Sequence, residues 1–66
     1  MNKDQILDII EQKRQEYAAD DKKHFDAAFK EKPGSPAFQE EFLKHMEAQA
    51  AARALGQIWF DVASMI

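Results

Sequence analysis

Four side chains in this sequence could together bind a metal ion. They are two histidines, His24 and His45, and two carboxylates, Asp21 and Glu41. Asp21 lies three residues before His24, and Glu41 lies four before His45, so on helices each carboxylate would share a side with its imidazole. Imidazole nitrogens and carboxylate oxygens are ligands for zinc and other divalent metals.

The spacing of these four residues does not match the usual metal site of a helical bundle. Such sites use a Glu-x-x-His pair on each of two helices together with further glutamates. Here the intervals differ and the carboxylate set is incomplete. The preferred interpretation is therefore a pair of partly buried histidines beside phenylalanines, with no metal and no other cofactor.

No other pattern in the chain indicates catalysis. Gly34 and Gly56 stand alone, so no glycine-rich phosphate loop is present. Ser35 and Ser64 lack the strand–turn–helix context of a catalytic serine. A chain of two helices also offers little concavity in which a carboxylate could be tuned for acid–base work. We expect neither an enzyme nor a small-molecule substrate.

Basic residues in the first half of the chain leave a nucleic-acid-binding protein as the alternative. Within residues 3–32, eight acidic residues are interspersed among the basic ones, and the whole chain carries a net charge of −3. Mixed signs are typical of a solvated helix face rather than of a basic stripe. A small dimeric helical protein would bind nucleic acid through Lys3, Lys13, Arg14, Lys22, Lys23, Lys30 and Lys32.

The length and composition indicate one small domain that needs help to be stable. A chain of 66 residues buries only about 60% of its unfolded surface. Small domains are usually stabilised by disulfides, a metal or oligomerisation, and without cysteine disulfides and thiolate–metal sites are excluded. We expect a cytoplasmic protein: no signal peptide is visible at the first apolar cluster, and the polar residues in the C-terminal stretch argue against a membrane span.

Two helices must position these side chains. We therefore predict an all-α antiparallel hairpin that spans residues 1–66. Asn2 and Gln5 have the spacing of a capping box at the start of a helix over about 3–32. Pro33-Gly34-Ser35-Pro36 predicts a turn, with Ser35 capping a second helix over about 36–64. A break near Asp20 and Asp21 is a possible interruption of the first helix.

The apolar residues of each half fall at helical spacing and predict the contact between the helices. In the second helix the inward stripe is expected to be Phe38, Phe42, Leu43, Met46 and Ala50. If the chain folds back at this turn, any two residues that face each other across the hairpin should have numbers that add up to about 68. That register places Phe25 and Phe29 near Leu43 and Phe38, Tyr17 near Ala50 and Ala51, and Glu16 opposite Arg53, but it leaves Asp21 without a partner.

Two charged residues, Arg14 and Asp21, fall inside the apolar stripe of the first helix. One interpretation places both at the edge of the stripe, with their stems on apolar surface. The other is an ion pair buried across an interface.

The C-terminal stretch has more apolar surface than one neighbouring helix can cover. Ala48, Ala52 and Gly56 form a line of small residues, and the surrounding apolar side chains spread around the helix. We therefore expect a non-enzymatic protein–protein interaction module, a small adaptor, regulator or inhibitor. It would form a homodimeric four-helix bundle or bind another protein. The expected interface is Ala48, Ala52, Leu55, Gly56, Trp59, Phe60, Val62 and Met65.

Overall fold

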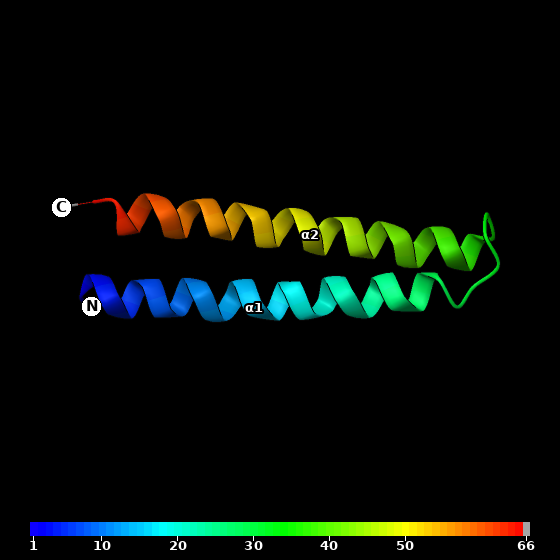
Figure 1. The fold of residues 1–66 in the computed structure, drawn as a ribbon, viewed down its shortest axis with the longest axis horizontal. Helices are drawn as coiled ribbons and strands as arrows, with labels where there is room; N and C mark the ends of the chain where they lie inside the picture. The colour runs from blue at the N-terminus through cyan, green and yellow to red at the C-terminus, as the bar shows by residue number, and fades with distance from the viewer. Residues whose placement is uncertain (66) are drawn as a thin grey trace.

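Two long helices packed side by side make up the structure. In this computed structural model, which describes residues 1–65, α1 spans Lys3–Ala28 and α2 spans Pro36–Ala63. They run antiparallel, so the two ends of the chain lie together opposite the turn (Figure 1). The hairpin is a rod of 50 × 14 × 12 Å. The prediction of an all-α hairpin is confirmed, and no strand occurs in the part of the chain that the structure describes.

The start of α1 is stabilised by the expected capping box. The Asn2 side chain accepts a hydrogen bond from the Gln5 backbone N–H at 2.9 Å, and the Gln5 side chain accepts one from the Asn2 N–H at 3.0 Å. Both bonds satisfy N–H groups that the first helical turn would otherwise leave free. The helix then continues through Asp20 and Asp21 without interruption.

The first helix ends at Ala28, four residues before the predicted end at Lys32. The last turn tightens, with Lys30 and Glu31 donating their N–H groups to Ala27 and Ala28 at 3.2 and 3.1 Å. The prediction considered only the proline at position 33, which restricts the residue before it. The chain must also cross to a second helix axis about 8–10 Å away, and this crossing requires it to leave the helix earlier.

The turn has the conformation that its residue types favour. Gly34 has a φ of 81°, a left-handed conformation that glycine adopts without steric cost. Ser35 caps α2 by accepting a hydrogen bond from the Phe38 N–H at 3.2 Å, and Pro36 begins the helix. The end of α2 at Ala63 lies one residue from the predicted end at 64.

The residues along the seam between the helices recur at alternating intervals of three and four. This is the spacing that lets two helices stay in contact over their whole length. In α1 the series is Leu7, Ile10, Arg14, Tyr17, Asp21, His24 and Ala28, and in α2 it is Phe38, Glu41, His45, Ala48, Ala52, Leu55, Trp59 and Val62. Six members of these series, Arg14, Tyr17, Asp21, His24, Glu41 and His45, are ionisable residues at positions that are usually apolar.

The seam makes a thin core. Within residues 1–65, only Ala28 and Ala48 are buried, and no large side chain is fully buried. The predicted inward stripe of α2 was partly wrong, because Leu43 is 59% exposed, Met46 is 50% exposed and Ala50 is also exposed. Glu41 and His45 lie in the seam instead, so the stripe of α2 is rotated from the one that apolar residues alone indicated.

Candidate interaction surface

Two histidine–carboxylate hydrogen bonds join α1 to α2. His24 Nδ1 donates to Glu41 Oε2 at 2.6 Å, and His45 Nδ1 donates to Asp21 Oδ1. Each helix therefore supplies one histidine and one carboxylate, and the pairs cross the seam. The expectation that Asp21 lacks a partner was wrong. Asp21 thus pairs across the seam, but with an imidazole and at a partly exposed position, so the buried ion pair of the second interpretation is not what the structure shows.

The two bridges share the four residues considered for a metal site. Among the described residues, no group of three or more such side chains is close enough to hold a metal ion. The hydrogen bond from His24 lowers the pKa of the Glu41 carboxyl below its ordinary value of 4.5. The charge of Lys44 acts in the same direction, whereas desolvation raises the pKa. The geometry is that of structural cross-links between helices.

The cross-helix contacts give a register close to the one that the turn predicts. Facing residue numbers total 65 for His24 with Glu41 and 66 for Asp21 with His45, and they reach 68 where Lys3 Nζ donates to the Met65 carbonyl. The turn alone predicted about 68. The shift of two or three residues near the turn is enough to pair each histidine with the opposite carboxylate.

Arg14, the other charged residue in the seam, bonds within its own helix. Its Nε donates to Glu11 Oε2 at 2.9 Å, which lowers the pKa of the Glu11 carboxyl. The stem lies beside Gly56, where a Cβ would stand 3.8 Å from Arg14 Cδ. The Arg14 stem therefore lies alongside Gly56 of α2, while its guanidinium is bound by Glu11 within α1.

Glu16 does not bond with Arg53, the residue expected opposite it. The Lys13 ammonium binds the Glu16 carboxylate within α1 instead, at 3.3 Å. The predicted cross-helix ion pair at this position is therefore replaced by one within a single helix.

An aromatic cluster closes the turn end of the hairpin. Phe29 meets Phe38 edge-on with ring centroids 5.9 Å apart, as the register predicted. The Phe25 ring centroid lies 4.7 Å from that of Phe29 and 5.0 Å from that of His45. Rings at these distances and tilts attract one another beyond the effect of burial alone. The cluster thus holds His45 where Asp21 can bind it.

The surface of the hairpin has shallow hollows that are open to solvent. One, of about 220 Å³, is lined by Tyr17, Asp20, His24, Lys44, Glu47 and Ala48. Tyr17 therefore lies beside Ala48, near the predicted Ala50 and Ala51 but closer to the turn. A second hollow, of about 300 Å³, lies at the end where the termini meet and is lined by Lys3, Ile6, Val62 and Met65.

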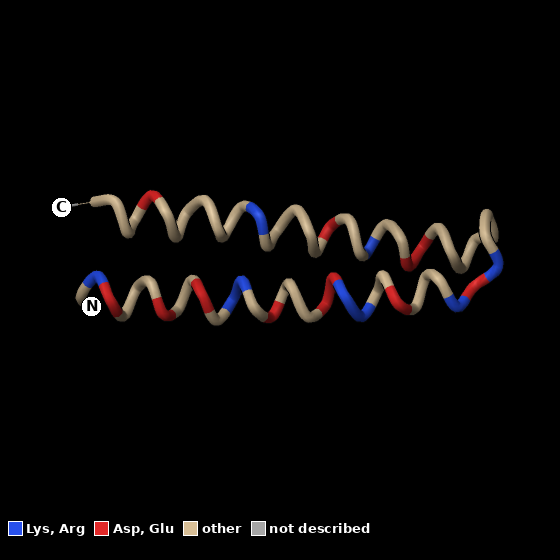
Figure 2. Tube along the Cα trace, in the orientation of Figure 1, with Lys and Arg blue, Asp and Glu red and all other residues tan. Residues whose placement is uncertain are grey.

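Charge is distributed unequally between the helices. Acidic and basic residues alternate along α1, whereas α2 is almost free of charge beyond Glu47, with Arg53 and Asp61 as the exceptions (Figure 2). The lysines proposed for nucleic-acid binding lie among carboxylates and do not form a continuous basic stripe. Large exposed apolar side chains occur on both helices, among them Ile9 and Phe25 on α1 and Leu43 and Phe60 on α2.

The residues predicted for an interface divide into two groups. Ala48 is 8% exposed and Gly56 faces Arg14, so both are already covered by α1. Ala52, Leu55 and Val62 are half-buried along the same seam. The exposed members are Phe60 and Met65, at 62% each, and Trp59, at 36%.

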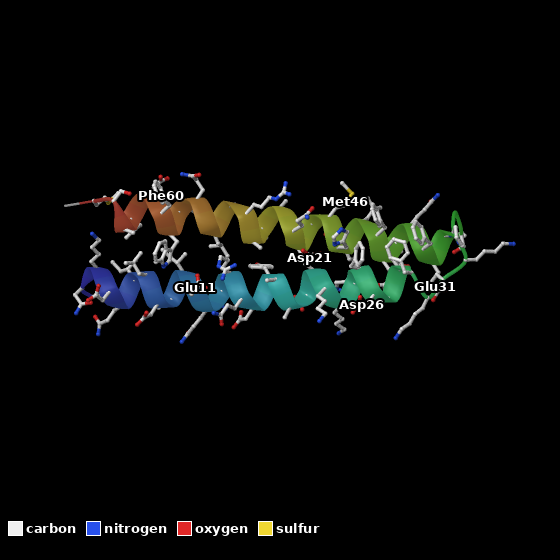
Figure 3. All side chains as sticks on the ribbon, viewed as in Figure 1. Glu11, Asp21, Asp26, Glu31, Met46 and Phe60 are labelled. Carbon is white, nitrogen blue, oxygen red and sulfur yellow. The ribbon has the colours of Figure 1, made fainter. Side chains whose placement is uncertain are left out.

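Exposed side chains of α2 form a surface on the side away from α1, here called the outer α2 face. Met46 and Phe60 both point away from α1 at this edge of the molecule (Figure 3). They are 14 residues apart, about 21 Å along the helix. At 3.5 residues per turn, the exposed residues of α2 on the same side are Pro36, Gln39, Glu40, Leu43, Met46, Glu47, Ala50, Arg53, Ala54, Gln57, Phe60 and Asp61. Sequence reasoning missed Leu43 and Met46 because it assigned them to the inward stripe.

No family model, curated protein or solved structure matches this chain. Neither helix, over the residues described, has an apolar stretch of the length and hydropathy that crossing a bilayer requires. Its function must therefore be inferred from the surface that the hairpin exposes.

Proposed function

We propose that this protein is a non-enzymatic protein–protein interaction module that self-associates into a four-helix bundle. It would serve as a small adaptor, regulator or inhibitor that presents helix surfaces to other proteins. Its working part would be the apolar surface of α2, with Phe60 as the central exposed aromatic. Phenylalanine is among the residues enriched at the buried centre of protein interfaces.

The thin core of the single hairpin, in which Ala28 and Ala48 are the buried residues of the described chain, is the observation that carries the proposal. In the described part of the chain, twelve large apolar side chains are more than a third exposed, while none is fully buried. They include Phe60, Phe29 and Leu43, with exposed fractions of 62%, 63% and 59%. Contiguous apolar surface on a small protein typically marks an interaction site.

The accessible area of the hairpin gives the size of the missing contact. A compact monomer of 7.6 kDa has an accessible surface of about 4,300 Å². The hairpin exposes 5111 Å², an excess of roughly 800 Å². A standard protein–protein interface buries about 800 Å² on each partner. Covering one face by a partner would thus give the hairpin a normal ratio of surface to mass.

The shape of the hairpin supports a partner of similar length. Its radius of gyration is 15.0 Å, whereas a compact chain of 66 residues has one of about 11 Å. A compact body with twice as many residues has one of about 14 Å. A second hairpin lying alongside the first would therefore bring the assembly near the dimensions of a compact domain.

Sedimentation equilibrium over a range of micromolar concentrations tests the proposal. We expect the unmodified protein to sediment as a dimer and Phe60→Asp to sediment as a monomer. Phe29→Asp provides a matched control, since Phe29 has almost the same exposed fraction but lies at the turn. Circular dichroism would confirm that each variant remains helical.

A monomeric unmodified protein throughout this range would contradict self-association. A dimer that Phe60→Asp leaves intact and Phe29→Asp dissociates would move the interface to the aromatic end. Either result would remove α2 as the surface of self-association.

A further inference from the structure

We infer that the hollow over Ala48 binds an arginine side chain of a partner protein. This inference rests on the proposed function and adds to it a second contact surface, together with the chemistry of the residue that fills it. The hollow is lined by both helices and shares only Glu47 with the outer α2 face.

The size of the hollow suits a single side chain. Its volume is about 220 Å³, whereas pockets for drug-sized ligands usually hold about 300–1,000 Å³. The floor is Ala48, a small side chain that is 8% exposed. The remaining lining residues are Tyr17, Asp20 and His24 from α1, and Lys44 and Glu47 from α2. A long side chain of a partner can therefore enter between the helices at this point.

Two carboxylates in the hollow are free to bind an incoming cation. Asp20 and Glu47 come from opposite helices, and both are exposed. Within residues 1–65, the acidic members of the ion pairs are instead Glu11, Glu16, Asp21, Glu40 and Glu41. Lys44 also lines the hollow, but its ammonium lies 3.4 Å from Glu40 and 3.9 Å from Glu41. The charges that remain unpaired in the hollow are therefore negative.

The other lining residues favour a planar cation. Tyr17 is 41% exposed, and a guanidinium gains energy by stacking on an aromatic face of this kind. His24 donates from Nδ1 to Glu41 at 2.6 Å, and a neutral imidazole in that tautomer has Nε2 as an acceptor. The five N–H donors of a guanidinium form a planar fork, which is enough to serve Nε2 and both carboxylates.

Other cations fit the hollow less well. A metal ion needs ligands that converge on one point, and no three histidine or carboxylate side chains of the described residues are close enough to do so. A lysine ammonium is a compact, strongly hydrated point charge. It therefore gains less from an aromatic face, and less from carboxylates that lie on opposite helices.

The arginine must come from another molecule. The chain has two arginines, Arg14 and Arg53, and neither lines the hollow. Arg14 is held within α1, with its Nε 2.9 Å from Glu11 Oε2. Arg53 lies on the outer α2 face, among the residues that the proposed self-association would cover. We therefore assign the arginine to a different protein.

Titration with N-acetyl-arginine amide, followed by NMR, tests the site. We expect saturable shifts of the Tyr17 ring and Ala48 amide signals, with a dissociation constant in the millimolar range. N-acetyl-lysine amide is the matched probe, because it has the same charge and backbone, and it should bind at least about threefold more weakly. Equal binding of the two amides would show a response to charge alone and would overturn the inference. Failure of the arginine amide to saturate in this range would also overturn it.

Two substitutions inside the hollow and one outside it complete the test. Asp20→Asn and Glu47→Gln each remove one negative charge while keeping the shape of the side chain, so each should weaken binding about two- to fivefold. Asp26→Asn removes the same charge from an exposed position on α1 outside the hollow and should leave binding unchanged. If both substitutions inside the hollow left binding unchanged, the probe would lie elsewhere and the inference would be wrong.

Sedimentation equilibrium separates this inference from the proposed function. A protein that dimerises but does not bind the arginine amide would overturn the inference alone. A monomer that binds the arginine amide would overturn self-association alone. If Arg53→Ala and added arginine amide both weakened the dimer, the arginine would be that of a second copy, which would contradict its assignment to a different protein.

Discussion

His45 donates a hydrogen bond to Asp21 across the seam between the two helices. The side chains come from α2 and α1 and are 24 residues apart in the chain. Both occupy positions where two packed helices usually place apolar residues. A polar pair at such a position disfavours other registers, because sliding the helices would leave both groups without a partner. The hairpin thus combines weak apolar packing with a specific alignment.

Breaking this pair should reveal coupling between the two residues. Removing either side chain leaves the other partly buried without its partner, so we expect Asp21→Ala and His45→Ala each to cost about 1 kcal/mol of unfolding free energy. The double variant should cost less than the sum of the two. Urea unfolding at one fixed protein concentration measures all three. Asp20→Ala is the matched control, since Asp20 is exposed and should change stability by less than about 0.5 kcal/mol. Additive single effects would mean that the hydrogen bond contributes nothing.

The His24–Glu41 bridge predicts a change of stability in acid. The pKa of Glu41 is lowered in the folded hairpin, first by the hydrogen bond from His24. The unfolded chain therefore binds more protons at this residue, and stability rises with pH. The contribution is present above the ordinary value of 4.5 and is lost as the pH falls through the lowered pKa.

Glu41→Gln should reduce this acid dependence without abolishing it. Glu11, whose pKa is lowered by Arg14, would supply the remainder. Urea unfolding at several pH values between about 3 and 5 gives the slope. Glu40→Gln is the adjacent control, and its slope should match that of the unmodified protein. Identical slopes for Glu41→Gln and Glu40→Gln would contradict the assignment to the bridge.

The two glycines should respond in opposite ways to alanine. At Gly56 an added Cβ would meet Arg14 Cδ at an ordinary contact distance of 3.8 Å, so the gain in helix propensity should stabilise the hairpin by about 1 kcal/mol. At Gly34 the φ of 81° makes alanine cost about 1–2 kcal/mol. Thermal unfolding of both variants gives the comparison. Destabilisation by Gly56→Ala would indicate a closer contact than the one described, and Gly56→Leu should be worse tolerated because it displaces the Arg14 stem.

The caps of the two helices should contribute measurably to stability. Asn2→Ala removes the side-chain acceptor of the capping box, and Ser35→Ala removes the acceptor at the start of α2. Each should cost about 1 kcal/mol in thermal or urea unfolding. Asn2→Asp keeps an acceptor at the cap and should restore most of the loss. A neutral Asn2→Ala would mean that the first turn of α1 is frayed in solution.

Most of the secondary structure could be predicted from local residue types. The capping box at Asn2 and the Pro-Gly-Ser-Pro turn each depend on a few neighbouring residues, so their effects can be recognised without knowledge of the rest of the fold. The end of α1 could not be placed this way. It depends on how far the chain must travel to reach α2, which is a property of the packed pair.

The rotation of α2 about its own axis, which decides the face that packs against α1, was predicted less well, because it too depends on the packed pair. Apolar spacing placed Leu43 and Met46 in the seam, yet Glu41 and His45 occupy it. Counting only apolar residues conceals a seam that contains ionisable residues. The alternation of three- and four-residue intervals through Phe38, Glu41, His45 and Ala48 was present in the sequence and would have identified the seam.

The sequence by itself determined two helices, their caps and the turn, because these depend on backbone preferences and hydrogen bonds between near neighbours. Only the tertiary structure decided which histidine bonds which carboxylate. A shift of two or three residues from the register of the turn brings each histidine to the carboxylate of the opposite helix, and such a shift is set by side-chain packing along the whole seam. The same packing decided that Ala48 is covered while Met46 and Phe60 remain exposed.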